Sequence, residues 1–120
     1  MPSTTTYERG RLVVVNVPFS NHSDMKPRPA LIVSLSSFHD DLPDVILCPV
    51  SSQPRRYRHP GPGDHPLRDW RVTGLRRPST VRVSKMLAVD KRIIKRTLGS
   101  LSAQDLVRVE RGLRDALGLR

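Results

Sequence analysis

The chain has 120 residues, which is the size of one domain, and we expect a single domain over residues 1–120. It carries 21 Lys and Arg against 11 Asp and Glu, for a formal net charge of +10. A lone cysteine, Cys48, excludes an intrachain disulfide framework and a Cys-based zinc site. No apolar run is long enough for a membrane span and no signal-peptide pattern opens the chain, so a cytoplasmic location is expected.

The positive charge is concentrated in the middle of the chain. Residues 54–96 hold 13 basic and 3 acidic side chains, whereas residues 1–53 and 97–120 are close to neutral. A concentrated positive field attracts polyanions such as nucleic acid, an acidic membrane or an acidic protein. The charge pattern therefore limits the class of partner without identifying it.

Three apolar runs in the first half of the chain predict β-strands. They are residues 12–17, which end at Pro18, residues 30–35 and residues 45–50. Polar loops separate them, and the second and third runs are expected to pair as an antiparallel hairpin. The first half therefore predicts a mainly β fold.

The proline-rich stretch of residues 53–78 predicts a surface excursion with one helical turn around residues 69–75. Trp70 lies within it and is interpreted as an anchor that packs the excursion onto the domain, with base stacking as the alternative. Residues 80–84 alternate at period two and predict a half-buried strand, which residues 86–89 are expected to continue after a bend.

Residues from Ser102 to the C-terminus predict the one long helix. Ser102 opens a capping box with Asp105 in the first turn, and apolar side chains follow at helical spacing. Glu110 and Arg114, four residues apart, predict a surface ion pair. Mixed charge on the polar face favours a helix that packs on the domain over one that binds a membrane.

Pairing arithmetic brings Arg28 and Ser51 together. In a hairpin of residues 30–35 with residues 45–50, paired residue numbers sum to about 79 or 80, so Arg28 lies opposite Ser51 or Ser52. Opposed side chains have Cβ atoms about 4.5–5.5 Å apart, so a guanidinium and a hydroxyl would converge on one phosphate. The alternative is that Arg28 only flanks a strand and Ser51 begins a turn.

Possible metal ligands gather before the third run: His39, Asp40, Asp41 and Asp44. The alternatives are a metal site and a solvated acidic turn, and the lack of a helical ligand frame favours the turn, so we expect no metal. The other histidines are expected at the surface: His22, His59 and His65. The sequence has neither a nucleophile elbow nor a phosphate-binding glycine loop, so most familiar enzyme signatures are absent.

Several short motifs follow one another in a specific order along residues 9–118. They are Asn16-Val17-Pro18-Phe19, Lys26 to Ser34, Cys48-Pro49-Val50-Ser51-Ser52, Asp69-Trp70 to Gly74-Leu75, Pro78-Ser79, Asp90-Lys91 and Leu98 to Ser102. This order resembles the PemK/MazF family of toxin endoribonucleases from bacterial toxin-antitoxin systems, and the later motifs resemble one of its subgroups. The ordered combination is more specific than any single motif.

The resemblance implies a compact SH3-like β-barrel of the PemK/CcdB-like type with a C-terminal helix, usually a homodimer. It implies an enzyme that cuts single-stranded RNA without a metal or other cofactor, by attack of the 2′-hydroxyl on the scissile phosphate. The family's catalytic pair corresponds to Arg28 and Ser51, the same two residues that the hairpin arithmetic brings together. Arg28 would stabilise the charged transition state, and Ser51 would donate to a phosphate oxygen.

The resemblance also implies RNA contacts from five further residues: Asn21, Asp24, Ser52, Arg82 and Lys85. The chain departs from its relatives at Arg11, which replaces an acidic residue, and at Lys85 and Leu87, which replace Gln and Arg. We expect these departures to alter the RNA sequence preference, with Lys85 as a replacement phosphate contact.

Two functions remain open at this point. The first is a ribonuclease toxin whose basic face binds an acidic, disordered segment of a cognate antitoxin. The second is a non-catalytic binding protein on the same barrel, either a topoisomerase inhibitor or an RNA-binding module. Metal-independent RNA cleavage that is lost in Arg28→Ala would support the first.

Overall fold

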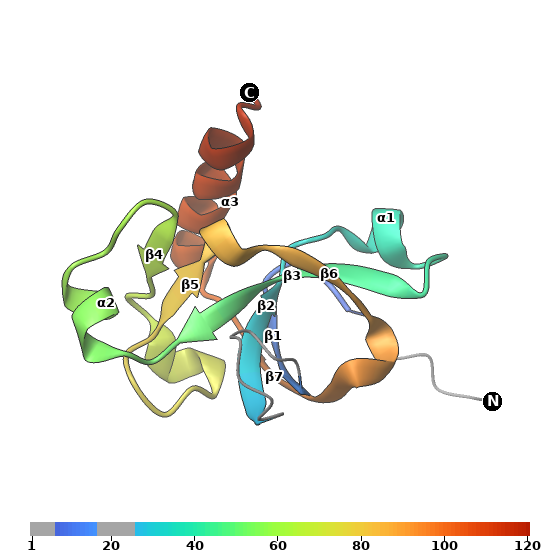
Figure 1. The fold of residues 1–120 in the computed structure, drawn as a ribbon, viewed down its shortest axis with the longest axis horizontal. Helices are drawn as coiled ribbons and strands as arrows, with labels where there is room; N and C mark the ends of the chain where they lie inside the picture. The colour runs from blue at the N-terminus through green and yellow to red at the C-terminus, as the bar shows by residue number, and fades with distance from the viewer. Residues whose placement is uncertain (1–6, 17–25) are drawn as a thin grey trace.

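The computed structural model describes residues 7–16 and 26–120, and Figure 1 shows its fold. Seven strands in these ranges form one sheet: β1 Arg11–Asn16, β2 Pro27–Ile32, β3 Asp44–Ser51, β4 Asp64–Pro66, β5 Thr80–Arg82, β6 Leu87–Asp90 and β7 Ile94–Ser100. Helical segments connect or flank them: α1 Ser36–His39, α2 Pro54–Arg58, η1 Trp70–Thr73, η2 Val83–Lys85, η3 Lys91–Ile93 and α3 Ala103–Leu117, where η marks a 3-10 helix.

The strands pair antiparallel in the order β4-β5-β3-β2-β1-β7. β3 is long enough to pair twice on one side, with β6 along its first half and with β5 at its last two residues. Within the described ranges β4 and β7 end this order and do not pair with each other. The mainly β fold with a C-terminal helix is confirmed, but the closed barrel is not, because the sheet is open.

Apolar side chains cover both faces of the sheet. A first core lies between the sheet and α3 and includes Leu12, Leu31, Cys48, Val50, Val81, Val109 and Leu113. A second core lies on the opposite face and includes Val13, Val15, Ala30, Ile32, Val45 and Leu47. Because β1 is covered on both sides, residues 12–15 are all buried and the strand is apolar throughout rather than alternating.

The observed strands differ from the predicted runs at several ends. β2 begins at Pro27, three residues before the predicted run, and ends at Ile32. β5 stops at Arg82 because η2 turns the chain there and directs Val83 into the first core. The excursion of residues 53–78 contains α2, β4 and η1, of which the sequence predicts only η1, and β7 is not predicted at all.

The C-terminal helix forms as predicted, and its cap explains where it begins. The Ser102 hydroxyl accepts a hydrogen bond from the Asp105 N–H at 3.2 Å. The predicted Glu110–Arg114 pair is wrong, because the Glu110 carboxylate pairs with Arg9 at 3.1 Å. Among the residues that the structure describes, no helix has both the length and the apolar character needed to span a bilayer.

Candidate functional site

Strands β2 and β3 set the relative positions of Arg28 and Ser51. Their register pairs Ala30 with Pro49, so paired residue numbers sum to 79. Continuing that register two residues beyond the end of the ladder puts Arg28 opposite Ser51. Alternation along each strand assigns both side chains to the face of the second core, where Ala30 and Leu47 lie. Arg28 is exposed and Ser51 is half-buried, so both are open to solvent.

The Ser51 hydroxyl is oriented by the chain that follows it. Its oxygen accepts a hydrogen bond from the Gln53 N–H at 3.2 Å, which leaves the O–H group available as a donor. On the other side of β3, Ser51 pairs with Thr80 of β5. Directly paired side chains share a face of the sheet, so Ser51 and Thr80 lie on one face, and the extended β2–β3 register would add Arg28 to this row.

Thr80 is a residue of this row that the sequence does not single out. Its side chain is completely buried, and within the described residues its hydroxyl has no hydrogen-bond partner. Buried hydroxyl groups are normally bonded, so the unpaired hydroxyl of Thr80 is expected to cost stability, and with no exposed surface it is out of reach of a ligand. The period-two pattern of residues 80–84 puts Thr80 on a strand, but its place beside Ser51 depends on long-range pairing.

The other predicted RNA-binding residues are more dispersed. Ser52 is exposed and, as the next residue after Ser51, belongs to the opposite face of the sheet. Arg82 is half-buried, and its Nε atom lies 3.7 Å from the Asp64 carboxylate. Lys85 is exposed on η2, five residues after Thr80, the residue that pairs with Ser51. The predicted contacts Asn21 and Asp24 lie outside the described residues.

Asp64 neutralises part of the basic segment. Its nearly buried carboxylate lies 3.4 Å from Arg56 and 3.7 Å from Arg82, and it accepts a hydrogen bond from the Gly61 N–H at 3.0 Å. These contacts tie the start of the excursion to β4 and β5. Arg56 and Arg82 therefore have a structural role in the folded chain.

The aromatic residues of the excursion anchor it. Trp70 is half-buried against the first core, and the Arg71 guanidinium lies 4.6 Å from the centre of its ring. The Tyr57 hydroxyl donates to the Leu67 carbonyl at 2.9 Å. This geometry favours the anchor over base stacking for Trp70.

His39 is part of the core, not a metal ligand. It is fully buried, and its Nε2 atom lies 2.6 Å from the Tyr7 carbonyl, which can only accept a hydrogen bond. Its Nδ1 atom therefore accepts from the Ser34 hydroxyl at 2.7 Å, so both ring nitrogens are engaged. In the described ranges no three His, Cys, Asp or Glu side chains gather as a metal site. The acidic turn is the better interpretation.

The remaining histidines differ from one another. His59 is exposed as predicted, and His22 lies outside the described residues. His65 is half-buried, so the predicted surface position is only partly confirmed, and its ring packs where a side chain at Gly112 of α3 would otherwise lie. Burial lowers the pKa of His65, and the carboxylates of Asp64 and Asp115 act in the opposite direction.

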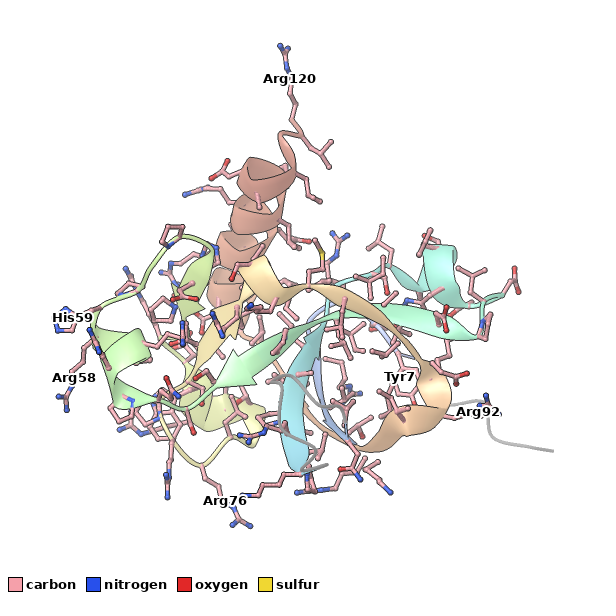
Figure 2. All side chains as sticks on the ribbon, viewed as in Figure 1. Tyr7, Arg58, His59, Arg76, Arg92 and Arg120 are labelled. Carbon is pink, nitrogen blue, oxygen red and sulfur yellow. The ribbon has the colours of Figure 1, made fainter. Side chains whose placement is uncertain are left out.

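A basic groove of about 460 Å³ lies next to Arg28 and Ser51 but on the first-core face. Its lining from the sheet comprises Val14, Pro27, Pro29, Ser52, Arg96 and Leu98. Its lining from the loop between η1 and β5 comprises Gly74, Leu75, Arg76, Arg77 and Ser79. Figure 2 shows Arg76 at the opposite end of the molecule from Arg120, which follows α3. We use the name basic groove for this set of residues.

Comparison with known proteins identifies similar sequences and folds. A family model described as the PemK-like, MazF-like toxin of type II toxin-antitoxin systems matches residues 8–117. MazF from Deinococcus radiodurans is similar in structure, with a TM-score of 0.75 and 24% identity over 97% of this chain and 100% of that one. MazF in a MazE-MazF complex from the same organism gives a TM-score of 0.74 and 22% identity over 98% and 100%.

The Mycobacterium tuberculosis toxin MazF-mt6 gives a TM-score of 0.72 and 20% identity over 92% of this chain and 98% of that chain. At these identities the solved structures establish a shared fold. A search of curated proteins finds no match.

Proposed function

Because the chain belongs to the PemK-like, MazF-like toxin family of type II toxin-antitoxin systems, we propose that it is an endoribonuclease that cleaves single-stranded RNA. The observation that carries this proposal is the β2–β3 register, which, continued two residues past the Ala30–Pro49 pair, would bring the exposed guanidinium of Arg28 opposite the hydroxyl of Ser51. Two such groups on adjacent strands can bind one phosphodiester from the same side.

The proposed reaction uses the RNA 2′-hydroxyl as the nucleophile. Its oxygen attacks the adjacent phosphorus and loses its proton, and the 5′-oxygen leaves and gains one, which gives a 2′,3′-cyclic phosphate and a 5′-hydroxyl. Arg28 stabilises the negative charge that develops on the phosphate, and Ser51 donates a hydrogen bond to one of its oxygens. The protein residues supply this stabilisation themselves, so the reaction is proposed to need no metal.

The test is cleavage of a mixed-sequence single-stranded RNA in excess EDTA. Wild-type protein should cut it, Arg28→Ala should abolish cutting, and Ser51→Ala should lower kcat by about 10²–10³-fold, the usual effect of losing one oxyanion donor. Ser51→Thr keeps the hydroxyl and should retain activity. Undiminished cleavage by Arg28→Ala would remove the mechanism, and RNA binding without cleavage by the wild type would favour a non-catalytic RNA-binding module.

We further propose a cytoplasmic homodimer that is inhibited by a cognate antitoxin. The similar structures include MazE-MazF complexes and a mycobacterial endoribonuclease bound to its cognate antitoxin, which supports the choice of partner. An acidic antitoxin segment would complement the charge of residues 54–96. Light scattering of the purified chain tests the dimer, and a monomer at micromolar concentration would contradict it.

A further inference from the structure

We propose that the basic groove binds the phosphate backbone of the RNA strand beside the scissile bond, an inference that rests on the proposed ribonuclease function. Three guanidinium groups line the groove, from Arg76, Arg77 and Arg96, and none of the described residues that line it is acidic. All three side chains are exposed. The described residues thus give the groove a concave, positively charged surface that is open to a polyanion.

The electrostatics of this groove differ from those of the neighbouring basic residues. Arg56 and Arg82 share the buried carboxylate of Asp64. Within the described part of the chain, by contrast, Arg76 and Arg77 form no ion pair with an acidic side chain. Exposed guanidinium groups that are not engaged by a carboxylate of the described chain can contact the phosphates of a bound strand.

The loop that carries Arg76 and Arg77 is fixed at both ends. At its start the buried Thr73 hydroxyl donates to the Trp70 carbonyl at 2.5 Å and accepts from the Leu75 N–H at 3.1 Å. At its end the Ser79 hydroxyl donates to the Arg77 carbonyl at 2.8 Å. A loop that is already ordered loses less conformational entropy when a ligand binds.

Close packing against β7 also fixes this loop. A Cβ atom at Gly99 would lie 2.9 Å from the Thr73 carbonyl oxygen, so η1 approaches β7 at a position where only glycine fits without a shift. Arg96 belongs to the same strand as Gly99. The packing therefore holds the arginine pair of the loop at a set distance from the arginine of the sheet.

The groove begins one residue from the proposed catalytic pair. Ser52 follows Ser51 on the chain, and Pro27 and Pro29, which flank Arg28, also line the groove. Successive residues of a strand are about 3.3 Å apart and point to opposite faces. β2 starts and β3 ends here, so an RNA strand crossing these strand ends can contact Arg28 and Ser51 on one face and enter the groove on the other.

The first experiment measures how binding depends on salt. The probe is a 2′-O-methyl oligonucleotide, which lacks the nucleophile and cannot be cleaved. Replacement of the three groove arginines (Arg76→Gln, Arg77→Gln and Arg96→Gln together) should lower the slope of log K against log salt by about 2, since each lost phosphate contact removes about 0.7. The matched control replaces three exposed arginines that do not line the groove, Arg111 and Arg114 of α3 and Arg120 after it, and should keep the wild-type slope.

The second experiment separates flank binding from a structural effect. The groove variant should raise KM for a long RNA and leave the cleavage of a short RNA that spans only the scissile bond unchanged. An unchanged slope and unchanged KM in the groove variant would overturn this inference while leaving the proposed ribonuclease intact. If the groove variant lost affinity for poly-L-glutamate but bound RNA with the wild-type salt slope, the inference would also be overturned, in favour of an acidic protein partner. If the wild type does not cleave RNA, the proposed ribonuclease function fails, and the salt slope still shows whether the groove arginines contact RNA phosphates.

Discussion

At Thr80, a buried and unpaired hydroxyl is expected to lower the stability of the fold. Its hydroxyl is buried without a partner in the described residues, next to Ser51. Thr80→Val removes this hydroxyl with little change of shape, and it should raise the free energy of unfolding by about 1 kcal/mol because an unsatisfied polar group is lost. The hydroxyl has no exposed surface through which to contact RNA, so the same variant should cleave RNA at the wild-type rate.

Urea unfolding and single-turnover cleavage give the two measurements for Thr80. Ser79→Ala is the matched control, since the Ser79 hydroxyl already donates to the Arg77 carbonyl and its loss should destabilise the chain. A Thr80→Val protein that is no more stable than the wild type would contradict the unpaired hydroxyl, and slower cleavage would mean that RNA reaches Thr80.

His65 gives the fold a specific pH dependence. Its pKa lies below the ordinary value of 6.5 in the folded chain, chiefly through burial. At a pH between the folded and the unfolded pKa of His65, the unfolded chain binds more protons than the folded chain. The contribution of His65 to the free energy of unfolding is therefore complete above about pH 6.5 and declines as the pH falls through the folded pKa. His65→Gln should flatten this decline.

The measurement for His65 is the free energy of urea unfolding from pH 5 to 7.5. His59→Gln, at an exposed position, is the control and should leave the profile unchanged. The same slope in His65→Gln as in the wild type would assign the pH dependence to another group.

The sequence predicts some residue environments and misses others for one physical reason. The relation of Arg28 to Ser51 follows from the pairing of two successive apolar strands, so its register can be estimated from the positions of their runs in the chain. The ring of His39 is hydrogen-bonded to the carbonyl of Tyr7, 32 residues earlier in the chain, and the ring of His65 packs against Gly112 of α3. A pattern of local residues carries no information about such contacts.

At the scale of elements, Asp105 joins the excursion to α3. Its buried carboxylate accepts hydrogen bonds from the N–H groups of Arg68 at 3.1 Å and Asp69 at 2.8 Å, and it pairs with Arg108 at 3.0 Å. Asp105→Ala leaves both N–H groups without this partner and should lower the free energy of unfolding by about 2–4 kcal/mol. Urea unfolding measures it, with the exposed Asp115→Ala as control, and equal losses in both variants would contradict this role.

The elements that the sequence predicts are those with a strong local pattern. β1 and β3 contain apolar runs that the fold buries, and α3 has a cap and a helical repeat. β7 is mostly exposed and contains Lys95 and Arg96, so its composition hides a strand that pairing with β1 stabilises. α2 and β4 are short, and their positions depend on Asp64 and on β5.

At the scale of the whole molecule, the excess charge divides into two classes. Part of it is neutralised within the fold, as at Arg56 and Arg82, and part faces outward, as at the three arginines of the basic groove. The sequence gives the net charge of residues 54–96 but not this division, because ion pairs form between strands that meet only after folding. The division decides which arginines are available to a polyanion.

The cysteine thiol reports on the opening of the whole fold. Cys48 is fully buried in β3 beneath α3, and burial raises the pKa of its thiol to about 12. The thiolate is the reactive form, so the folded chain at pH 8 should not react with a thiol reagent until the sheet opens. In increasing urea the labelling rate should rise in step with the unfolded fraction. A double variant, Ser37→Cys with Cys48→Ala, moves the thiol to an exposed position on α1 and should react at once. Fast labelling of Cys48 in the native chain would mean that α3 and the sheet separate locally, well below the free energy of global unfolding.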